Sequence, residues 1–353
     1  MASSPWVARG LMVRVTSIAA SLNLAAESVM IFVQTFSSQP AGTECAPMLE
    51  CRDCQCCLGL QGNHCIVVVP VYQDRFTAVE AAALHVCSQR LQAYPIAIVH
   101  KRSSPVDSVR SLVEPLLCEQ QQRQYVSVDD QWLHSVDSYN RMLLQAWFYH
   151  LFALWDYMLI FQLDAWIFRD NLDQWLARGY TYIGAPWIRA LGTDTPDTGV
   201  GNGGLSLRHV KSFARILESP LNRYWPVFRW HTLAWRICLF RRYSMLPPAS
   251  RPVYFAKRLF LFLIMSFGWH NTLAYFVKTN KLEDHFFSFF APLVHGWMRV
   301  PSLQQAALFS IETNPRATLQ WTGTLPFGCH AWQKHDPDVW LMQCPEEFKT
   351  LLP

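Results

Sequence analysis

The stretch IVVVPV, Ile66–Val71, decides the fold because it is an almost unbroken run of apolar, largely β-branched residues. A run without polar alternation is typical of a strand that is buried on both faces, as in a parallel sheet. A helical pattern over residues 76–94 and a second buried run, "IAIVH" at 96–100, follow it. Strand, helix and strand at this spacing form a βαβ unit, which predicts a parallel sheet with right-handed crossovers.

The same alternation continues along the chain and predicts the α/β class, with a mostly parallel, Rossmann-like central sheet flanked by helices. "AALFSIE", residues 306–312, predicts a further strand near the end. The other elements that we expect are a helix at 105–122, a strand at 125–128, one long helix at 135–157, a strand at 158–163, a strand ending at 187 and an extended segment at 204–208.

Composition supports a folded chain with a large core. Of 353 residues, 51% are hydrophobic and 16% charged, which argues against extensive disorder. We divide the chain into an irregular N-terminal extension (1–63), a main domain (64–335) with a helical insert (220–280), and a C-terminal tail (336–353). The net charge of +4 and the lack of nucleic-acid-binding signatures argue against a nucleic-acid partner.

Five of the eleven cysteines lie close together in "CRDCQCCLGLQGNHC", residues 51–65. Such a cluster could hold zinc or an iron–sulfur centre, but its spacing matches no standard ligand pattern, which favours an irregular extension. The apolar stretch before it is interrupted by Arg14, Asn23 and Glu27. We therefore expect no cleaved signal sequence and a cytoplasmic protein.

An acid, Asp164, follows the apolar strand predicted at 158–163. In open α/β sheets, ligands bind outside the carboxyl ends of the strands. A carboxylate at that position suits a Mg²⁺ or Mn²⁺ ion that is held against a diphosphate. The alternative is a turn or helix N-cap, since Asp suits both.

Three further segments place polar groups where apolar structure ends. In "GNGG", Asn202 can hydrogen-bond a sugar hydroxyl and the glycines allow a close backbone approach; the alternative is a hairpin turn. Glu283 or Asp284 could act as a general base; the alternative is a solvated helix start. His330 could complete the coordination of a metal; the alternative is a structural histidine.

Taken in order, these segments resemble a known family. The blocks "VVVPVY", "WDYMLIFQLDAWIF", "YIGAPW", "GNGGLSLR", "EDHFFS" and "PFGCHAW" are similar to those of a bacterial family of uncharacterised function. Its members look like GT-A glycosyltransferases and often occur in surface-polysaccharide settings. The resemblance covers about residues 65–332 and implies a GT-A-like fold and transfer of a sugar from a nucleotide-sugar donor.

The resemblance also implies roles for the donor and metal residues. Asp164 stands where the metal-binding DxD motif stands in GT-A enzymes, although Trp166 replaces its second acid. His330 would supply a further ligand to the divalent cation, Mn²⁺ or Mg²⁺. The donor-binding residues would be Pro70, Val71 and Tyr72 around the base and Asn202, Gly203 and Gly204 against the sugar.

The base of an inverting displacement would be Asp284 or Glu283, of which we favour Asp284. The expected acceptor is a polysaccharide, a glycan or a lipid-linked saccharide. Residues 223–281, where aromatic and basic residues interleave, suit either a buried helical subdomain or peripheral contact with the inner face of a membrane.

Two other functions stay open at this point. One is a nucleotidyl- or phosphotransferase, which would need a basic cradle near the first strand, where only Arg75 is present. The other is a non-catalytic nucleotide- or sugar-binding module of a polysaccharide assembly system, which the missing second acid of DxD favours.

Overall fold

The computed structural model describes residues 64–188, 199–224, 252–253, 272–278 and 282–348. The chain divides into two compact units, Met1–Gly59 and Leu60–Pro353, and all described residues belong to the second. The extension at 1–63, with all of the cysteine cluster except Cys65, lies outside the described residues, as does most of the insert at 220–280.

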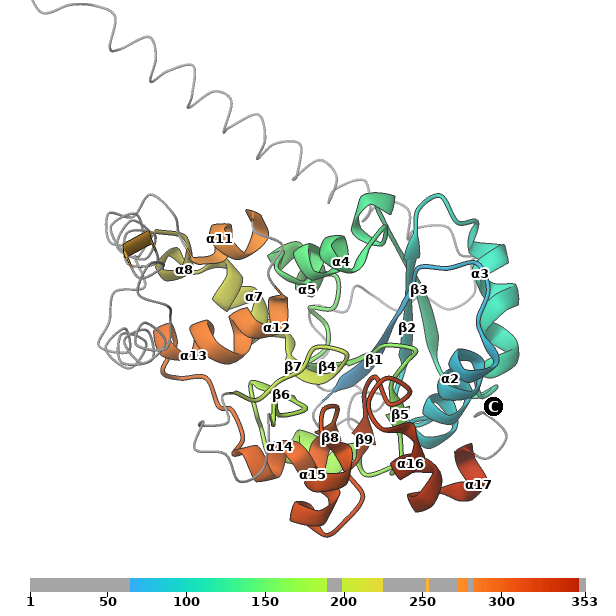
Figure 1. Ribbon diagram of the computed structural model, residues 1–353. Helices are drawn as coiled ribbons and strands as arrows, with labels where there is room; N and C mark the ends of the chain where they lie inside the picture. Colours follow the sequence, from blue (N-terminus) through green and yellow to red (C-terminus); the bar gives the residue numbers. More distant parts are fainter. Residues whose placement is uncertain (1–63, 189–198, 225–251, 254–271, 279–281, 349–353) are drawn as a thin grey trace, which may run out of the picture. The chain divides into compact units, whose positions relative to one another are not determined.

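A six-stranded sheet in the order β3-β2-β1-β4-β7-β6 forms the centre of this unit (Figure 1). Strands β1, β2, β3 and β4 are mutually parallel, and β7 runs antiparallel to both β4 and β6. The sheet is therefore mixed and mostly parallel, as predicted. The strands are β1 (Cys65–Val71), β2 (Ile96–Lys101), β3 (Arg123–Val128), β4 (Tyr157–Phe161), β6 (Tyr182–Gly184) and β7 (Leu205–His209).

Helices bury both faces of this sheet. Val67 and Val69 of β1 face α2 (Ala78–Arg90) and α3 (Val106–Val113), whereas Ile66 and Val68 face the opposite layer. That opposite layer contains α4 (Val136–Leu143), α5 (Ala146–His150) and α7 (Val210–Glu218). Because alternate residues of β1 enter different cores, both sets must be apolar, which explains the unbroken run in the sequence.

A smaller three-stranded sheet, β5-β9-β8, lies at the carboxyl ends of the central strands. It consists of β5 (Trp166–Ile167), β8 (Ser310–Ile311) and β9 (Gly328–Cys329). β5 follows β4 after a short turn, so the small sheet brings the C-terminal part of the chain to the end of β4. The helices around it are α14 (Leu303–Phe309), α15 (Pro315–Thr322), α16 (Pro337–Gln343) and α17 (Pro345–Phe348).

The segment that we separated as a C-terminal tail contributes to the core. Trp340 of α16 stacks on Phe168 at 5.3 Å between ring centroids, and Phe348 of α17 packs against Trp166. Glu347 accepts a 2.6 Å hydrogen bond from Trp166 Nε1 and forms an ion pair with Arg90 of α2. These contacts attach the end of the described chain to both β5 and α2.

Several sequence-based expectations were wrong in detail. The helix expected at 105–122 ends by residue 116, and the strand expected to end at 187 ends at 184. The long helix predicted at 135–157 is two helices, α4 and α5, separated by Gln145 in an extended conformation. After the break, Phe148 and Tyr149 are both buried in the core that also contains Met142. The strand predicted at 306–312 is mostly α14, because Ser302 and Gln305 form a capping box that starts a helix there.

The remaining elements connect these layers. Residues 283–294 form one helical stretch that contains a π-helical turn, η4. Within the described ranges, no helix has both the length and the apolar character needed to cross a membrane. The elements are η1 (Glu114–Leu116), η2 (Asp130–Trp132), α6 (Leu172–Ala177), α8 (Pro220–Tyr224), α11 (Thr272–Lys278), α12 (Glu283–His285), η4 (Phe286–Phe290) and α13 (Ala291–Val294).

The packing of α16 predicts that Trp340→Ala lowers the free energy of unfolding by about 3–5 kcal/mol, the usual cost of removing a buried aromatic side chain. Met342 lies on the same helix but is 65% exposed, so Met342→Ala should change stability by no more than about 0.5 kcal/mol. Urea unfolding of both variants measures the difference. Equal, small effects would show that α16 is not part of the core.

Candidate functional site

Asp164 lies in the turn that follows β4, where the Ala165 amide donates to the Gln162 carbonyl at 2.9 Å. Its side chain is 51% exposed. His330 follows β9, and its Nε2 lies 3.2 Å from Asp164 Oδ1 and 3.2 Å from Gln162 Oε1. The small sheet thus brings together the two residues that the sequence suggested as metal ligands.

Glu312, which the sequence analysis did not select, joins this pair to the glycine-rich turn. Its Oε1 lies 3.3 Å from His330 Nδ1, and its Oε2 accepts a 2.8 Å hydrogen bond from Asn202 Nδ2. The other atom of the Asn202 amide, Oδ1, accepts from the Gly204 backbone amide at 3.0 Å. Each ring nitrogen of His330 therefore faces a carboxylate, Nδ1 that of Glu312 and Nε2 that of Asp164.

The positive charge of His330 and the negative charges of Asp164 and Glu312 stabilise one another. Burial by itself would lower the pKa of His330, but its hydrogen bonds to Asp164 and Glu312 raise that pKa to about 9. Burial would likewise raise the pKa of Asp164, yet the hydrogen bond and the positive charge of His330 outweigh burial and lower it. In the ligand-free protein, Asp164 is therefore an ionised acid next to an imidazolium.

Gly203 and Gly204 allow the turn to approach its neighbours more closely than a side chain would permit. A Cβ atom on Gly204 would lie 1.9 Å from His330 Nε2, and one on Gly203 would lie 2.6 Å from Glu283 Oε1. The turn also belongs to an antiparallel connection, since Pro186 and Val200 form a bridge and β6 pairs with β7. The turn therefore connects two antiparallel segments, as a hairpin does, and its backbone also lies close to His330 and Glu283.

On the other side of this turn, Arg208 of β7 and Glu283 of α12 form a buried ion pair at 2.7 Å, with side-chain exposures of 0% and 2%. The Arg208 guanidinium also donates to Ser206 Oγ and Tyr149 Oη, and more weakly to the Gly203 carbonyl. One oxygen of Glu283 is thus committed to a saturated structural network. The ion pair favours Asp284 over Glu283 as the acid that can accept a proton, because the Arg208 charge stabilises ionised Glu283.

Asp284 is a buried acid with an unusual pKa. Gly203 and His285 donate their backbone amides to its two oxygens, at 3.3 and 2.7 Å. Burial and the neighbouring charge of Glu283 outweigh these hydrogen bonds and raise the pKa of Asp284 to about 8. An acid with such a pKa is suited to accept a proton near neutral pH.

The residues predicted to line the base pocket differ in what they expose. Pro70 and Val71 are buried in β1, where they pair with Val99 and His100 of β2. Tyr72, which follows the strand, is 48% exposed. Burial, and then the charge of Asp164, raise the pKa of the Tyr72 hydroxyl, which places this ring near the acid. Tyr72 therefore offers the accessible side chain of this group.

Trp166 stands where a second acid was expected, and the structure points it away from Asp164. It belongs to β5, is 1% exposed and packs among Trp332 and Phe348. Its side chain fills the core between the small sheet and α17, so no second carboxylate from this strand can reach a metal.

No three His, Cys, Asp or Glu side chains in the described parts of the chain are arranged to hold a metal ion. The two groups present, the Asp164 carboxylate and the His330 imidazole, are nevertheless donors that Mn²⁺ and Mg²⁺ accept in proteins when phosphate oxygens and water complete the shell. Only neutral imidazole binds metal, so a cation would have to replace the proton that His330 shares with its two acids. The donor chemistry fits a cation that arrives with a diphosphate.

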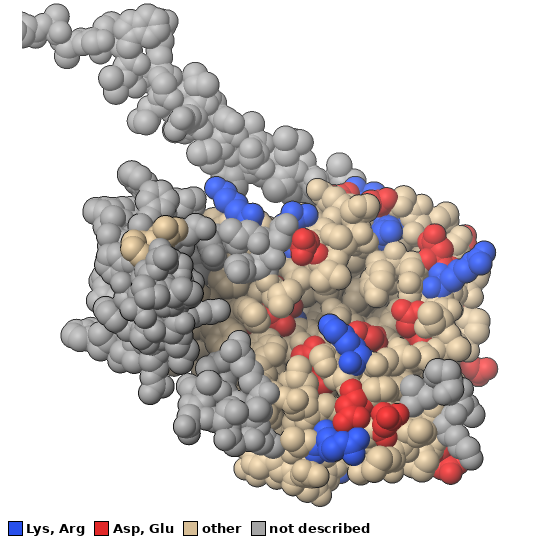
Figure 2. Space-filling view, viewed as in Figure 1, with Lys and Arg blue, Asp and Glu red and all other residues tan. Residues whose placement is uncertain are grey.

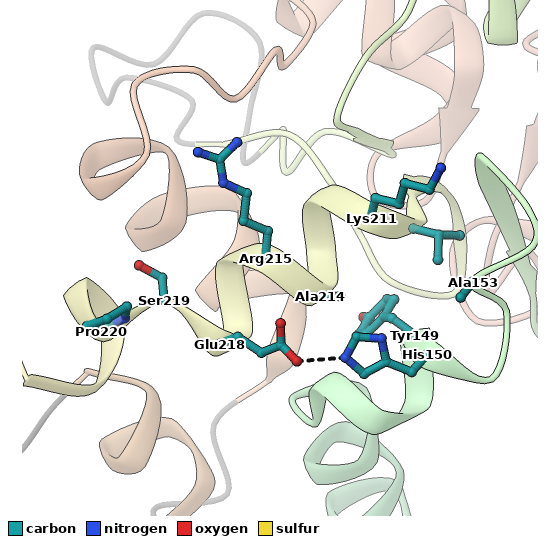
Figure 3. Close-up of a pocket in the computed structure, with 10 residues that line it drawn as sticks. Tyr149, His150, Ala153, Lys211, Ala214, Arg215, Glu218, Ser219 and Pro220 are labelled. Carbon is teal, nitrogen blue, oxygen red and sulfur yellow. Dashed lines mark hydrogen bonds and ion pairs between the residues drawn. The ribbon is translucent and has the colours of Figure 1, made fainter.

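The charged side chains on the described surface are of both signs. On the face shown in Figure 2, acidic and basic side chains are interspersed around a central hollow, and the described part of that face carries no broad basic patch. A separate hollow of about 440 Å³ lies between α5 and α7, beside the 2.6 Å hydrogen bond between His150 Nε2 and Glu218 Oε1 (Figure 3). None of the residues selected from the sequence lines it.

The sequence analysis missed Glu312, Gln162 and Arg208. Each carried a signal: Glu312 follows an apolar run, as Asp164 does, and Arg208 is a charged residue within the extended segment "GLSLR". Gln162 lies two residues before Asp164 in the same turn. Glu312 and Gln162 share one pattern, because each is a polar residue directly after a buried strand.

Residues 122–330 match the model of a family described as "Protein of unknown function (DUF5672)", and the chain belongs to that family. The match begins at residue 122, so β1 and β2 lie outside it. No curated protein matches the sequence.

Several solved structures share partial similarity with the chain. The mannosyltransferase Ktr4p from S. cerevisiae in complex with GDP has 9% identity and a TM-score of 0.29, over 36% of this chain and 40% of that chain. Core-mannan synthase A from Aspergillus fumigatus, in an Mn/GDP form, has 9% identity and a TM-score of 0.33, over 50% and 67%. Mouse xyloside xylosyltransferase 1, in its apo form, has 13% identity and a TM-score of 0.30, over 44% and 72%.

The buried ion pair predicts that Arg208→Ala lowers the free energy of unfolding by about 3–5 kcal/mol, because it leaves the Glu283 carboxylate buried and uncompensated. Arg316 provides a matched control, since it pairs with Asp336 at 3.1 Å in an exposed position. Arg316→Ala should cost less than about 1 kcal/mol. Urea unfolding at pH 7 compares them, and a small effect of Arg208→Ala would contradict the network.

Proposed function

We propose that this member of DUF5672 is a glycosyltransferase that moves a sugar from a nucleoside diphosphate to a hydroxyl acceptor, with Asp284 as the general base. One observation carries the proposal: the glycine turn Asn202–Gly204 contacts Asp164's partner His330 on one side and Asp284 on the other. Gly203 and Gly204 carry no side chain, so the space between the proposed cation-binding acid and the proposed base suits a sugar whose two faces need different chemistry.

On the donor side, Asp164 and His330 would hold the diphosphate through a divalent cation. When bound, that cation would neutralise the charge that develops on the leaving diphosphate. Glu312 would hold the His330 ring in its orientation. Through its hydrogen bond from Asn202, Glu312 would also hold the glycine turn next to His330. Tyr72, exposed beside Asp164, would contact the nucleotide, and Asn202 would contact the sugar.

On the acceptor side, ionised Asp284 would take the proton from the attacking hydroxyl. The acceptor oxygen would form its bond to the anomeric carbon while the bond from that carbon to the diphosphate oxygen breaks, and the nucleoside diphosphate would leave with the electron pair. A base on the face opposite the leaving group fits inversion at the anomeric carbon. The amides of Gly203 and His285 hold the carboxylate of Asp284 in place.

A second candidate function is a non-catalytic nucleotide- or sugar-binding module. The burial of Trp166 favours it, because the site then has only one strand-end carboxylate for a cation. Turnover separates the two functions. Hydrolysis or transfer of a nucleotide sugar by the wild type but not by Asp284→Asn, which should still bind the nucleotide, would establish the enzyme.

We expect one of UDP, GDP, CMP or dTDP to raise the melting temperature (Tm), more so with Mn²⁺, because a ligand that binds only the folded state stabilises it by about 2.7 kcal/mol at 100 times its Kd. Asp164→Ala should lose the Mn²⁺ increment. Asp173→Ala, which removes an exposed acid from α6, should keep it. A Mn²⁺ increment that survives in Asp164→Ala would contradict the assigned role.

The environment of Asp284 predicts a distinctive pH dependence. Because its pKa is about 8, kcat/KM should rise as pH increases towards 8 and level off above it. Asp284→Asn should lower kcat by about 10²–10⁴-fold and remove this rise. A profile that is flat between pH 6 and 9 in the wild type would exclude Asp284 as the base.

The raised pKa of Asp284 also predicts that the stability of the fold decreases with pH, whereas kcat/KM increases. An acid whose pKa is raised by folding stabilises the fold while it is protonated, and this stabilisation is lost as pH rises through about 8. The Tm of Asp284→Asn should therefore exceed that of the wild type above pH 8, with the difference vanishing near pH 4. Asp137→Asn, at an exposed position of α4, should show no such crossover.

A further inference from the structure

Three aromatic rings form a partly exposed cluster beside the proposed base. Trp187 stacks on Phe289, with ring centroids 5.3 Å apart and 26° between the ring planes. The His285 ring is steeply inclined to both, with its centroid 5.1 Å from that of Trp187 and 5.5 Å from that of Phe289. All three side chains are partly exposed, whereas the neighbouring Phe286 and Phe287 are fully buried. The cluster is therefore at the surface and does not belong to the core.

The cluster adjoins both the proposed base and the glycine-rich segment. The His285 backbone amide donates to Asp284 Oδ1 at 2.7 Å, so one of the three rings belongs to a residue that holds the base. The Trp187 backbone amide donates to the Gly199 carbonyl at 3.3 Å. Gly199 has a φ of +127°, and a Cβ atom there would overlap the Phe289 ring, so only glycine lets this ring lie against the backbone. Segments that are distant in the sequence thus bring these rings next to Asp284.

The helical stretch that carries two of the rings is irregular at this point. Residues Phe286–Phe290 form the π-helical turn η4, and π-helical turns are frequent at functional sites. The Ser288 hydroxyl of this turn donates to the Gly201 carbonyl at 3.4 Å. The hydrogen bond attaches the aromatic cluster to the same glycine-rich segment that contacts the base.

The ring geometry leaves the indole of Trp187 accessible. The three centroid separations, 5.1, 5.3 and 5.5 Å, form a nearly equilateral triangle. His285 therefore lies beside the stack, on the Phe289 side of the indole, and neither ring covers the opposite face of Trp187. Because Trp187 is partly exposed, a ligand can reach the indole without a movement of the protein.

A sugar ring is the ligand that suits these neighbours. A pyranose has C–H bonds on its faces and hydroxyls around its rim, and the partly positive C–H hydrogens are attracted to the electron-rich face of an indole. Asp284, next to the cluster, is the proposed acceptor of a hydroxyl proton. A nucleobase also stacks on tryptophan, but the proposed diphosphate ligands Asp164 and His330 lie across the glycine turn from Asp284. The position therefore favours the acceptor over the donor.

We infer that Trp187, supported by Phe289 and His285, is the stacking platform for the acceptor, and that the acceptor is a saccharide whose ring lies on the indole. This inference rests on the proposed function and names the acceptor class for it. A sugar ring on Trp187 has its hydroxyls at its rim, and one of them faces Asp284, which takes its proton in the proposed reaction. Trp187 binds the acceptor and takes no part in the proton transfer.

Trp187→Leu tests the platform, because leucine keeps an apolar contact with Phe289 but has no aromatic face. The probes are the methyl glycosides of D-glucose, D-galactose and D-mannose, observed by saturation-transfer difference NMR with and without UDP or GDP. At least one should receive saturation from the wild type. Trp187→Leu should weaken its binding by about three- to tenfold, and Trp187→Phe should restore most of it. D-Glucitol, which has hydroxyls but no ring, should receive none.

Trp297→Leu is the matched control. Trp297 is 39% exposed, contacts the His295 ring at 5.5 Å between centroids and lies 4.9 Å from the Arg215 guanidinium. It therefore has a similar set of neighbours but lies outside the cluster. Trp297→Leu should leave glycoside binding unchanged, and the Tm of each variant shows whether it is folded.

The outcomes separate the platform from the proposed function. If the wild type binds none of the glycosides, or if Trp187→Leu and Trp297→Leu have equal effects, the platform is wrong. If Trp187→Leu instead weakens saturation of the base protons of UDP or GDP, Trp187 contacts the donor and the inference is overturned. Glycoside binding that depends on Trp187 in a protein that transfers no sugar would support a saccharide platform and refute the proposed function. Where transfer is measured, Trp187→Leu should raise KM for the glycoside and leave KM for the donor unchanged.

Discussion

The buried ion pair between Arg208 and Glu283 is the interaction on which the arrangement of the site depends. Arg208 lies on β7 and Glu283 begins α12, so the pair connects the antiparallel edge of the sheet to the helical stretch that follows the insert. The same guanidinium reaches the Gly203 carbonyl, while the Gly203 amide reaches Asp284. A charge pair fully removed from water permits few alternative geometries, so it fixes the turn and the base together.

The parts of the fold that could be predicted are those that follow from patterns of neighbouring residues in the sequence. The β-branched run at β1 and the βαβ spacing predicted the parallel strands, and the structure confirms them. Asp164 and His330 were selected because each follows an apolar segment, and the structure brings them within 3.2 Å. Local patterns sufficed there because strand burial and strand ends depend on neighbours in the sequence.

What the sequence did not reveal depends on contacts between distant segments. Glu312 lies next to His330 only because β8 pairs with β9 beside the end of β4. The break between α4 and α5 likewise reflects the need to bury Phe148 and Tyr149 in the layer that contains Phe213. Helical periodicity alone carries no information about such partners.

The burial of Trp166 limits which side chains position 166 can hold. An acid at this position would need to occupy a core filled by Trp332 and Phe348, and it would face the Glu347 carboxylate that now accepts the indole N–H. A single substitution towards a two-acid motif would thus remove a large apolar side chain and place two negative charges together. In this chain the packing around position 166 therefore disfavours a second carboxylate next to Asp164.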